Sequence, residues 1–276
     1  MTASAGRPSI LPTEAALSTA LITGASSGLG EQFAYSLGRR KYNLVLIARR
    51  EERMRSIAAR AKEMGAPETR VIACDLSRRE APEEIQRRLD GEQVTIDYLV
   101  NNAGFGTSGH FERLPLEREL EEIDLNVKAL VALTRLFLPA MVRRHGGTIL
   151  NVASTAAFQP VPYMTTYAAT KAFVLSFSQG LAAELSGTGV TVTAVCPGPV
   201  RTEFQGVAHN EKAFMPSFTY MEAPKVVEQA IAAAASRRGV YVNGALNFTM
   251  AQMTRFVPRS WVTAIARNIY RPAAGD

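Results

Sequence analysis

Short apolar runs alternate with longer segments of helical periodicity along most of the chain. Seven runs rich in leucine and β-branched residues are predicted to be strands: Ala20–Thr23, Leu44–Ala48, Val71–Cys74, Tyr98–Asn101, Thr148–Ala153, Val190–Cys196 and Val240–Val242. Most of them are apolar on both faces, which is typical of a parallel sheet covered by helices on both sides. The alternation therefore predicts an α/β fold with a doubly wound (Rossmann) parallel sheet of about seven strands.

The predicted helices carry start and stop signals. Ser77, followed three residues later by Glu80, fits a capping box ahead of a helix. The longest helical pattern runs from about residue 116 to 144, and Pro139 is expected to kink or end it. No uninterrupted apolar run approaches the roughly 18 residues that cross a bilayer, so no transmembrane helix is expected.

The length and composition fit one large globular domain. The chain has 276 residues, of which 47% are hydrophobic and 20% charged, and this argues against disordered, collagen-like and disulfide-framework classes. We expect a flexible extension over 1–17 and a single Rossmann-type domain over 18–247. That domain includes a segment over the sheet edge at about 198–222, and a basic amphipathic tail follows over 248–276.

Cysteine placement bears on the compartment. Cys74 and Cys196 are the two cysteines, and both fall at predicted strand ends rather than in a pattern of paired cysteines. The first 17 residues show no apolar region of signal-peptide length. A cytoplasmic protein is therefore expected.

The formal net charge of +6 is concentrated in the tail. Six arginines and one acid lie between Arg237 and Asp276, which leaves the remaining chain nearly neutral and argues against nucleic-acid binding. Pro258 suits the first position of a helix. The predicted helix has a basic stripe and an apolar stripe, formed by Arg259, Arg267 and Arg271 and by Trp261, Ile265 and Ile269. Such a helix can dock on its own domain or in an oligomer, bind a partner, or touch an anionic membrane.

A glycine-rich turn joins the first predicted strand to a helix. The turn includes Thr23, Gly24, Ser26, Ser27, Gly28, Leu29 and Gly30. Glycines let the backbone approach a pyrophosphate, and the helix N-terminus presents unpaired N–H groups to it. A dinucleotide site is therefore predicted, the alternative being a tight strand-to-helix turn with no ligand.

Arg49 lies about 20 residues further on, after the second predicted strand. A carboxylate at this place would bind a ribose 2′-hydroxyl, whereas an arginine can bind a 2′-phosphate, so NADP is favoured over NAD. The alternative is that Arg49 and Arg50 pair with the two glutamates that follow. Asp75, beside Leu76 after the third strand, is placed to accept a hydrogen bond from an adenine amino group or to cap the next turn.

Three polar residues suggest proton transfer. Tyr167 and Lys171 are four residues apart and share one face of a predicted helix. An ammonium about 4 Å from the phenol contributes about 4 kcal/mol at an effective dielectric of 20, which would bring the pKa of Tyr167 near 7. Ser154 ends the fifth strand, where ligands bind in such sheets. The alternative is a surface tyrosine packed on a lysine stem.

Other catalytic classes find little support. A serine nucleophile needs a histidine base, and His110, His145 and His209 show no recognisable arrangement with a serine. The two cysteines and three histidines also lack metal-ligand spacing, so no metal site is expected.

Taken together, the motifs resemble the short-chain dehydrogenase/reductase family, in its compact single-domain branch. The resemblance covers about residues 19 to 202. It rests on the turn at 23–30, the Asn-Asn-Ala-Gly at 101–104, Asn126, Ser154, Tyr167-x-x-x-Lys171 and the Pro-Gly-Pro-Val-Arg-Thr at 197–202. One departure is Ala129, where many members have glycine.

The resemblance implies roles for these residues. Tyr167 would be the acid/base, Ser154 the orienting hydroxyl, Lys171 the pKa modulator and ribose ligand, and Asn126 the anchor of a proton relay. The cofactor would be lined by Asn102, Ala103, Gly104, Pro197 and Gly198, while Val200 and Thr202 would contact the carboxamide. A homodimer or homotetramer is also expected.

The substrate segment is rich in soft and aromatic residues: Phe204, Phe214, Met215, Phe218, Tyr220 and Met221. A lipophilic carbonyl compound fits such a segment, the alternative being that these residues only pack it onto the body. We expect an NADP-dependent oxidoreductase that transfers hydride between nicotinamide and a carbonyl or alcohol carbon. The rival interpretations are a sugar-nucleotide epimerase or dehydratase and a non-catalytic NADP sensor.

Overall fold

A computed structural model of the chain describes residues 18–201 and 220–271. Its seven strands form one parallel sheet in the order β3-β2-β1-β4-β5-β6-β7. The strands are β1 (Thr19–Thr23), β2 (Asn43–Ala48), β3 (Thr69–Ala73), β4 (Tyr98–Asn101), β5 (Gly147–Val152), β6 (Val190–Cys196) and β7 (Val240–Val242). The predicted doubly wound sheet is confirmed, and each strand end lies within two residues of its prediction.

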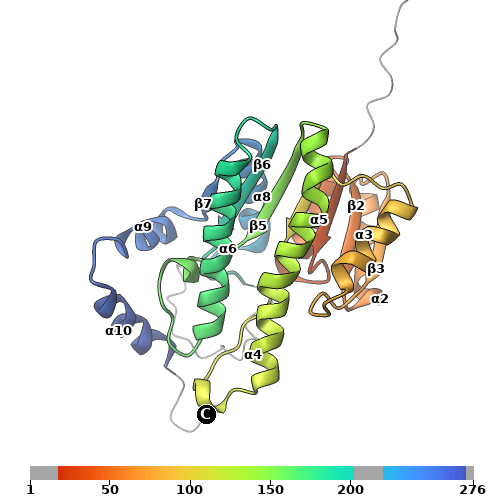
Figure 1. Cartoon of the computed structure of the whole chain (residues 1–276). Coiled ribbons are helices and arrows are strands. Elements are labelled where there is room, and N and C mark those ends of the chain that lie inside the picture. Colours follow the sequence, from red (N-terminus) through yellow and green to blue (C-terminus); the bar gives the residue numbers. More distant parts are fainter. Residues whose placement is uncertain (1–17, 202–219, 272–276) are drawn as a thin grey trace, which may run out of the picture.

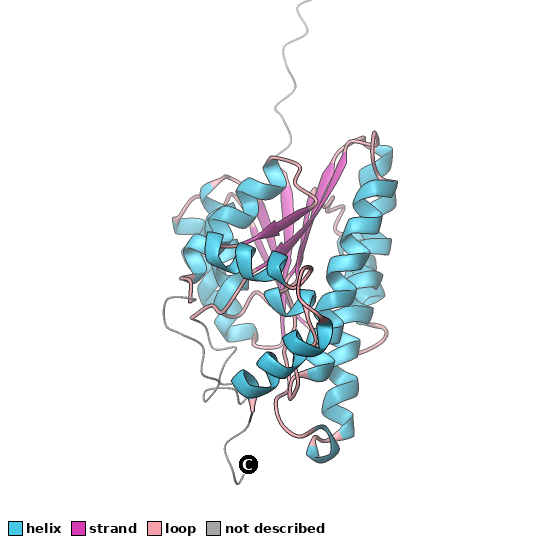
Figure 2. Ribbon diagram, turned by 90° about the vertical axis from the view of Figure 1, so that its left-hand side faces the viewer, coloured by secondary structure: helices cyan, strands magenta, loops and turns pink. Residues whose placement is uncertain are grey.

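Two layers of helices enclose the sheet, as Figures 1 and 2 show. One face is covered by α1 (Gly28–Arg39), α2 (Glu51–Glu63) and α8 (Ala223–Ala235). The other face is covered by α3 (Ala81–Gly91), α5 (Leu130–Arg143) and α6 (Thr165–Glu184). Short 3₁₀ turns occur at Phe111–Arg113 and Thr155–Phe158.

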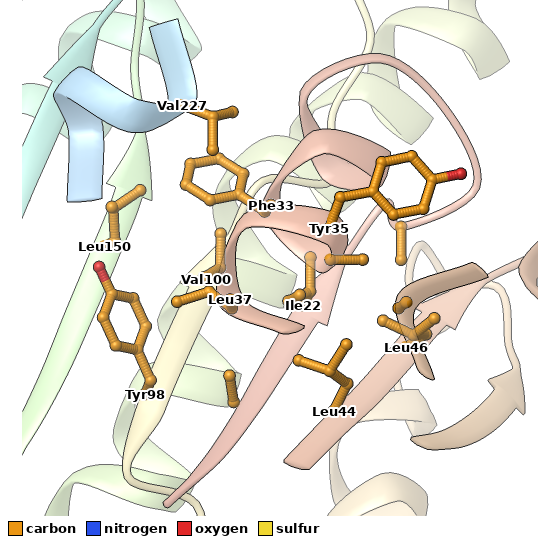
Figure 3. Close-up of a cluster of buried hydrophobic side chains, with 14 of the residues drawn as sticks. Ile22, Phe33, Tyr35, Leu37, Leu44, Leu46, Tyr98, Val100, Leu150 and Val227 are labelled. Atoms are coloured by element: carbon orange, nitrogen blue, oxygen red, sulfur yellow. The ribbon is translucent and has the colours of Figure 1, made fainter. Parts of the chain in front are cut away.

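The apolar character of both strand faces follows from this enclosure. In β1, Ile22 packs beneath α1 while its neighbour Leu21 belongs to the cluster on the opposite face. Figure 3 shows Phe33 and Leu37 of α1 over Ile22, with Val227 of α8 beside them. All of these side chains are at most 1% exposed. Each such burial stabilises the fold by about 1.5–3 kcal/mol, so both layers are held mainly by apolar contact.

The long predicted helix is interrupted by a wider turn. It consists of α4 (Leu116–Ile123), a π-helical turn at Asp124–Ala129, and α5, which continues through Pro139 rather than ending there. By length and composition this helical stretch could span a membrane, because an 18-residue window within it has a mean hydropathy of 1.5, contrary to the expectation from uninterrupted runs. Its buried side chains pack on the sheet, however, as in a core helix of a globular protein.

The predicted capping box before α3 is wrong. The N-cap residue of α3 is Glu80, which makes no side-chain cap hydrogen bond. Ser77 instead donates to Oδ1 of Asp75, from its backbone nitrogen at 3.0 Å and its hydroxyl at 2.8 Å. Asp75 therefore organises the turn after β3, which was the alternative role expected for it.

Two helices follow the last strand. They are α9 (Ala245–Met253) and α10 (Arg259–Tyr270), and Figure 1 shows both outside the sheet beyond β7. Pro258 is the N-cap residue of α10 rather than its first helical residue. The boundary expected at residue 247 falls inside α9. The expected extension over 1–17 and most of the segment over 198–222 lie outside the described residues, so the domain organisation stays a prediction.

Candidate active site

A cavity of about 460 Å³ opens at the carboxyl edge of the sheet, beside the point between β1 and β4 where the strand order reverses. Ligands bind at such switch points in doubly wound sheets. The cavity is lined by most of the residues predicted from the sequence: Gly24, Ser26, Ser27, Gly28, Leu29, Arg49, Asp75, Leu76, Asn102, Ala103, Gly104, Ser154, Tyr167, Lys171, Pro197, Gly198 and Val200.

Three of the predicted residues are not among those that line the cavity. Thr23 accepts hydrogen bonds at its hydroxyl from the backbone nitrogens of Asn102 and Ala103, both at 2.9 Å, and so holds that loop in place. Gly30 and Asn126 also do not line the cavity. Thr202 lies outside the described residues.

The glycine-rich turn has a geometry that only glycine fits at one position. A Cβ atom on Gly30 would lie 2.1 Å from the carbonyl oxygen of Gly24, far inside van der Waals contact. Gly24 and Gly28 adopt φ of +64° and +56°, in the left-handed region that favours glycine. Ser27, the N-cap residue of α1, makes no side-chain cap hydrogen bond. The first N–H groups of α1 are therefore presented to the cavity without a side-chain cap.

Two adjacent arginines border the same end of the cavity. Nη1 of Arg49 lies 3.5 Å from a carboxylate oxygen of Glu121, and its side chain is 64% exposed. Arg50 donates from Nη2 to the carbonyl oxygen of Ser26 at 3.0 Å and from Nε to the Ser26 hydroxyl at 3.3 Å. Pairing with Glu51 and Glu52 was the alternative for both arginines. Among the described residues, Arg49 pairs with Glu121 rather than with these glutamates, and Arg50 bonds to the glycine-rich turn.

The hydroxyl residues converge from two elements. Ser154 caps the 3₁₀ turn after β5, and its hydroxyl oxygen accepts from the backbone nitrogen of Ala156 at 3.1 Å. Tyr167 lies in the first turn of α6 and packs against the buried cluster of Val161, Met164 and Ala168, as Tyr270 also does. A hydrogen bond with Ser154 lowers the pKa of Tyr167, so the two hydroxyls share one site as expected.

The predicted pKa of Tyr167 is wrong in direction. Burial raises the pKa of this phenol above its usual value, and the hydrogen bond with Ser154 opposes that rise only partly. Nζ of Lys171 lies 5.7 Å from the ring centroid of Tyr167. Loss of hydration is the largest effect on the pKa of this phenol, which therefore remains protonated at neutral pH.

Lys171 is buried beside Tyr167, with 5% of the residue exposed. Its amine donates to the carbonyl oxygen of Val152 at 2.9 Å. Burial lowers the pKa of Lys171 to about 8, against an opposing effect of the Glu122 carboxylate. The amine therefore loses or gains its proton near neutral pH more easily than an exposed lysine.

Asn126 lies in the π-helical turn and is 1% exposed. Its Oδ1 accepts from the backbone nitrogen of Phe105 at 3.1 Å, and its Nδ2 donates to the carbonyl oxygen of Phe105 at 2.8 Å and to the Thr170 hydroxyl at 3.1 Å. The side chain thus fixes the cavity-lining loop to α6. Single π turns inside α-helices frequently occur at functional sites.

Two buried glutamates near the site were not predicted. Glu122 is fully buried, and its Oε2 accepts from the nitrogen and hydroxyl of Thr107 at 3.0 and 2.9 Å. Its Oε1 has no hydrogen-bond partner, and burial raises the pKa of Glu122 to about 7. The Thr107 hydroxyl also contacts Glu119, which bonds to Thr166 beside Tyr167. Glutamates on a helix usually face solvent, so no sequence signal marked this pair.

The apolar end of the cavity was predicted only in part. Tyr220 lines it as expected, whereas Phe204, Phe214, Met215 and Phe218 lie outside the described residues. The missed lining residues include Phe105, Leu125, Val161, Met164 and Tyr270. Tyr270 comes from α10, more than 100 residues after Tyr167, and nothing local in the sequence could reveal this contact.

Comparison with solved structures gives the same architecture. The chain is similar to a short-chain dehydrogenase from Sphingobium yanoikuyae in complex with NADPH, with a TM-score of 0.78 and 34% identity over 94% of this chain and 99% of that one. It is also similar to the bulky-bulky ketone specific alcohol dehydrogenase from Comamonas testosteroni, with a TM-score of 0.74 and 32% identity over 94% and 97%.

Sequence comparison agrees. The very-long-chain 3-oxoacyl-CoA reductase of Anas platyrhynchos is 36% identical over 194 residues, which are 68% of this chain and 62% of the duck protein. An uncharacterized oxidoreductase of Myxococcus xanthus is 38% identical over 67% of this chain and 73% of its own. The family model described as short chain dehydrogenase matches residues 18–213. On this match and on the architecture, the chain belongs to the short-chain dehydrogenase/reductase family.

Proposed function

We propose that the protein is an NADP-dependent reductase of lipophilic ketones, aldehydes or acyl compounds. The observation that carries this proposal is the continuity of one cavity, which has the glycine-rich turn at one end and Ser154, Tyr167 and Lys171 at the other. A pyridine nucleotide laid along this cavity supplies a hydride to a carbonyl carbon. The described residues then have to bind it, orient the substrate and provide a proton.

The residues at the nucleotide end fit a dinucleotide. The close approach at Gly30 leaves the turn without side chains that would block a pyrophosphate. The uncapped N-terminus of α1 offers N–H groups and a partial positive charge to its phosphates. Asn102 fixes the facing loop by donating from Nδ2 to the Thr23 carbonyl oxygen at 2.9 Å.

The residues at the other end fit the proton step of a reduction. A phenol held protonated by burial can donate to the oxygen of a carbonyl that gains a hydride, because the resulting alkoxide is a much stronger base than a phenolate. The hydroxyl of Ser154 lies in the same site and orients the carbonyl oxygen of the substrate. Lys171, close to the ring of Tyr167, stabilises the phenolate formed when the proton leaves.

Replacing Tyr167 by Phe tests this assignment. Loss of the hydroxyl should lower kcat by about 10²- to 10⁴-fold while NADPH still binds, because only the proton donor is removed. NADPH oxidation with aldehydes, ketones and acyl thioesters of graded chain length gives the rate, and fluorescence titration gives the binding. Tyr163→Phe is the matched control, since Tyr163 does not line the cavity. Equal activity in both variants would refute the role of Tyr167.

NADP preference is proposed from the two arginines at the nucleotide end. Arg49→Asp should weaken NADPH about 10- to 100-fold and leave NADH nearly unchanged, because a 2′-phosphate loses a charge-assisted contact. Arg55→Asp is the control, since its exposure resembles that of Arg49 and it pairs with Glu51 away from the cavity. Titration of each variant with NADPH and with NADH measures the two affinities. Equal losses for the two cofactors would assign Arg49 to the structure of the turn instead.

The substrate class is proposed from the apolar lining and from the relatives. Phe105, Val161 and Met164 line the cavity together with Tyr220 and Tyr270. Pockets that combine such a lining with few polar groups favour lipophilic ligands. The similar proteins named for 3-oxoacyl-CoA and bulky ketones point in the same direction. A homodimer or homotetramer in the cytoplasm remains part of the proposal, and sedimentation of the purified chain measures the subunit number.

A further inference from the structure

The surface of α9 and α10 is unusually apolar. Of the twelve large hydrophobic residues that are exposed in the described parts of the chain, seven lie between residues 246 and 265. They are Leu246, Phe248, Met250, Met253, Phe256, Trp261 and Ile265, with exposed fractions from 45% to 81%. Concentrated exposure of this kind marks a contact surface, whereas single exposed hydrophobic residues do not.

The same surface carries only positive charge. The stretch from Ala245 to Arg271 contains four arginines and no aspartate or glutamate. Arg255, Arg259, Arg267 and Arg271 are all exposed. An amphipathic helix with arginines around aromatic and aliphatic side chains is typical of elements that lie in the plane of a membrane interface.

Charge decides between a membrane and a second copy of the chain. A twofold contact through this surface would place four arginines of one chain against four of the other, with no acid from either α9 or α10 to neutralise them. Anionic phosphates supply the missing negative charge, and acyl chains accept Phe256 and Trp261. A lipid surface therefore satisfies both features of the patch.

We infer that α9 and α10 dock the protein on the surface of an anionic phospholipid membrane. Figure 1 shows the two helices on the outside of the molecule, beyond β7, where they can reach a flat surface. The last residue of α10, Tyr270, lines the cavity and packs against the same buried cluster as Tyr167. The docked element is thus also a wall of the cavity, which suits a substrate that partitions into lipid. This last link alone rests on the proposed function.

Trp261 is the only tryptophan of the chain, and it is 67% exposed on α10. Its fluorescence therefore reports on this surface alone. Vesicles of phosphatidylcholine with phosphatidylglycerol should shift its emission to shorter wavelength, and pure phosphatidylcholine vesicles should not. Raising the salt from 0.1 to 0.5 M should weaken binding about tenfold, because the phosphate contacts are exposed to solvent.

Two variants make the test specific. In vesicle co-sedimentation, Phe256→Ser and the double variant Arg259→Gln with Arg267→Gln should each bind at least about tenfold less. Phe111→Ser is the control, since Phe111 is 63% exposed on another part of the molecule, and it should bind like the natural chain. Neither the fluorescence assay nor the co-sedimentation assay depends on catalysis, so both outcomes are independent of the proposed function.

Three results would overturn the inference. The first is an unchanged Trp261 emission with anionic vesicles. The second is a shift without vesicles that grows with protein concentration, which would assign the surface to a second copy. The third is equal loss of binding in the Phe111 control.

Discussion

At the scale of single residues, the glycine-rich turn is where the sequence prediction and the steric requirements of the structure agree most closely. Replacing Gly30 by Ala should lower the free energy of unfolding by about 1–3 kcal/mol, because its Cβ would overlap the Gly24 carbonyl and meet the Asn102 amide at 2.8 Å. Urea denaturation measures the loss. Cofactor binding should fall as well, since relief of the overlap moves the loop that lines the cavity.

Gly180 provides the matched control. It lies in the exposed face of α6, and a Cβ atom there meets no atom within 4 Å. Gly180→Ala should therefore stabilise the protein by about 0.5–1 kcal/mol through helix propensity. If both variants destabilised the chain alike, a general intolerance of α1 and α6 to substitution would replace the steric explanation.

Residues whose role depends on local sequence were predictable from the chain alone. Gly24, Ser154 and Lys171 line the cavity, as predicted. Each could be placed from the sequence because it lies at a predicted strand end or at a helical spacing from another site residue. The pKa of Tyr167 was not predictable in this way. The direction of the pKa shift depends on burial of the phenol in the folded protein, where Tyr167 packs against the cluster of Val161, Met164 and Ala168, and no spacing rule conveys such desolvation.

At the scale of elements, the buried glutamates tie α4 to the active site. Glu122 bonds to Thr107 in the cavity loop, and Glu119 bonds to Thr166 at the start of α6. One turn further along, the π-helical turn carries Asn126, which holds the same loop at Phe105. Two carboxylates of α4 therefore link elements inside the protein rather than facing solvent.

Glu122 makes stability depend on pH. Its folded pKa is about 7 because of burial, whereas a free glutamate titrates near 4.3, so the folded state holds more protons between these values. The free energy of unfolding should therefore fall as the pH rises from 5 to 7, by about 2 kcal/mol from this group. Glu119 and Lys171 face the same carboxylate and make the transition broad.

Glu122→Gln isolates this effect, because an amide cannot titrate. The stability of the variant relative to the natural chain should increase between pH 5 and pH 7, as measured by urea denaturation at each pH. Glu117→Gln is the control on the exposed side of α4 and should show no such change. If the free energies of unfolding of Glu122→Gln and the natural chain differed by the same amount at every pH in this range, Glu122 would not be the titrating group.

At the scale of the whole molecule, a parallel sheet of seven strands with helices on both faces follows from the pattern of apolar runs and helices. Strands buried on both faces need two helical layers, and a doubly wound sheet supplies them. The cavity then lies where the strand order reverses. The placement of α10 was not predictable, because its contact with the cavity joins residues far apart in the chain and has no local periodicity.

Tyr270 closes the cavity from an element beyond residue 213, where the family match ends. The groups proposed for hydride and proton transfer lie upstream of that point, so one wall of the binding space can vary without altering them. Exchange of α9 and α10 between related chains should therefore change which carbonyl compounds are accepted while leaving nucleotide affinity intact. Any fusion or truncation near the carboxyl end would disturb selectivity first.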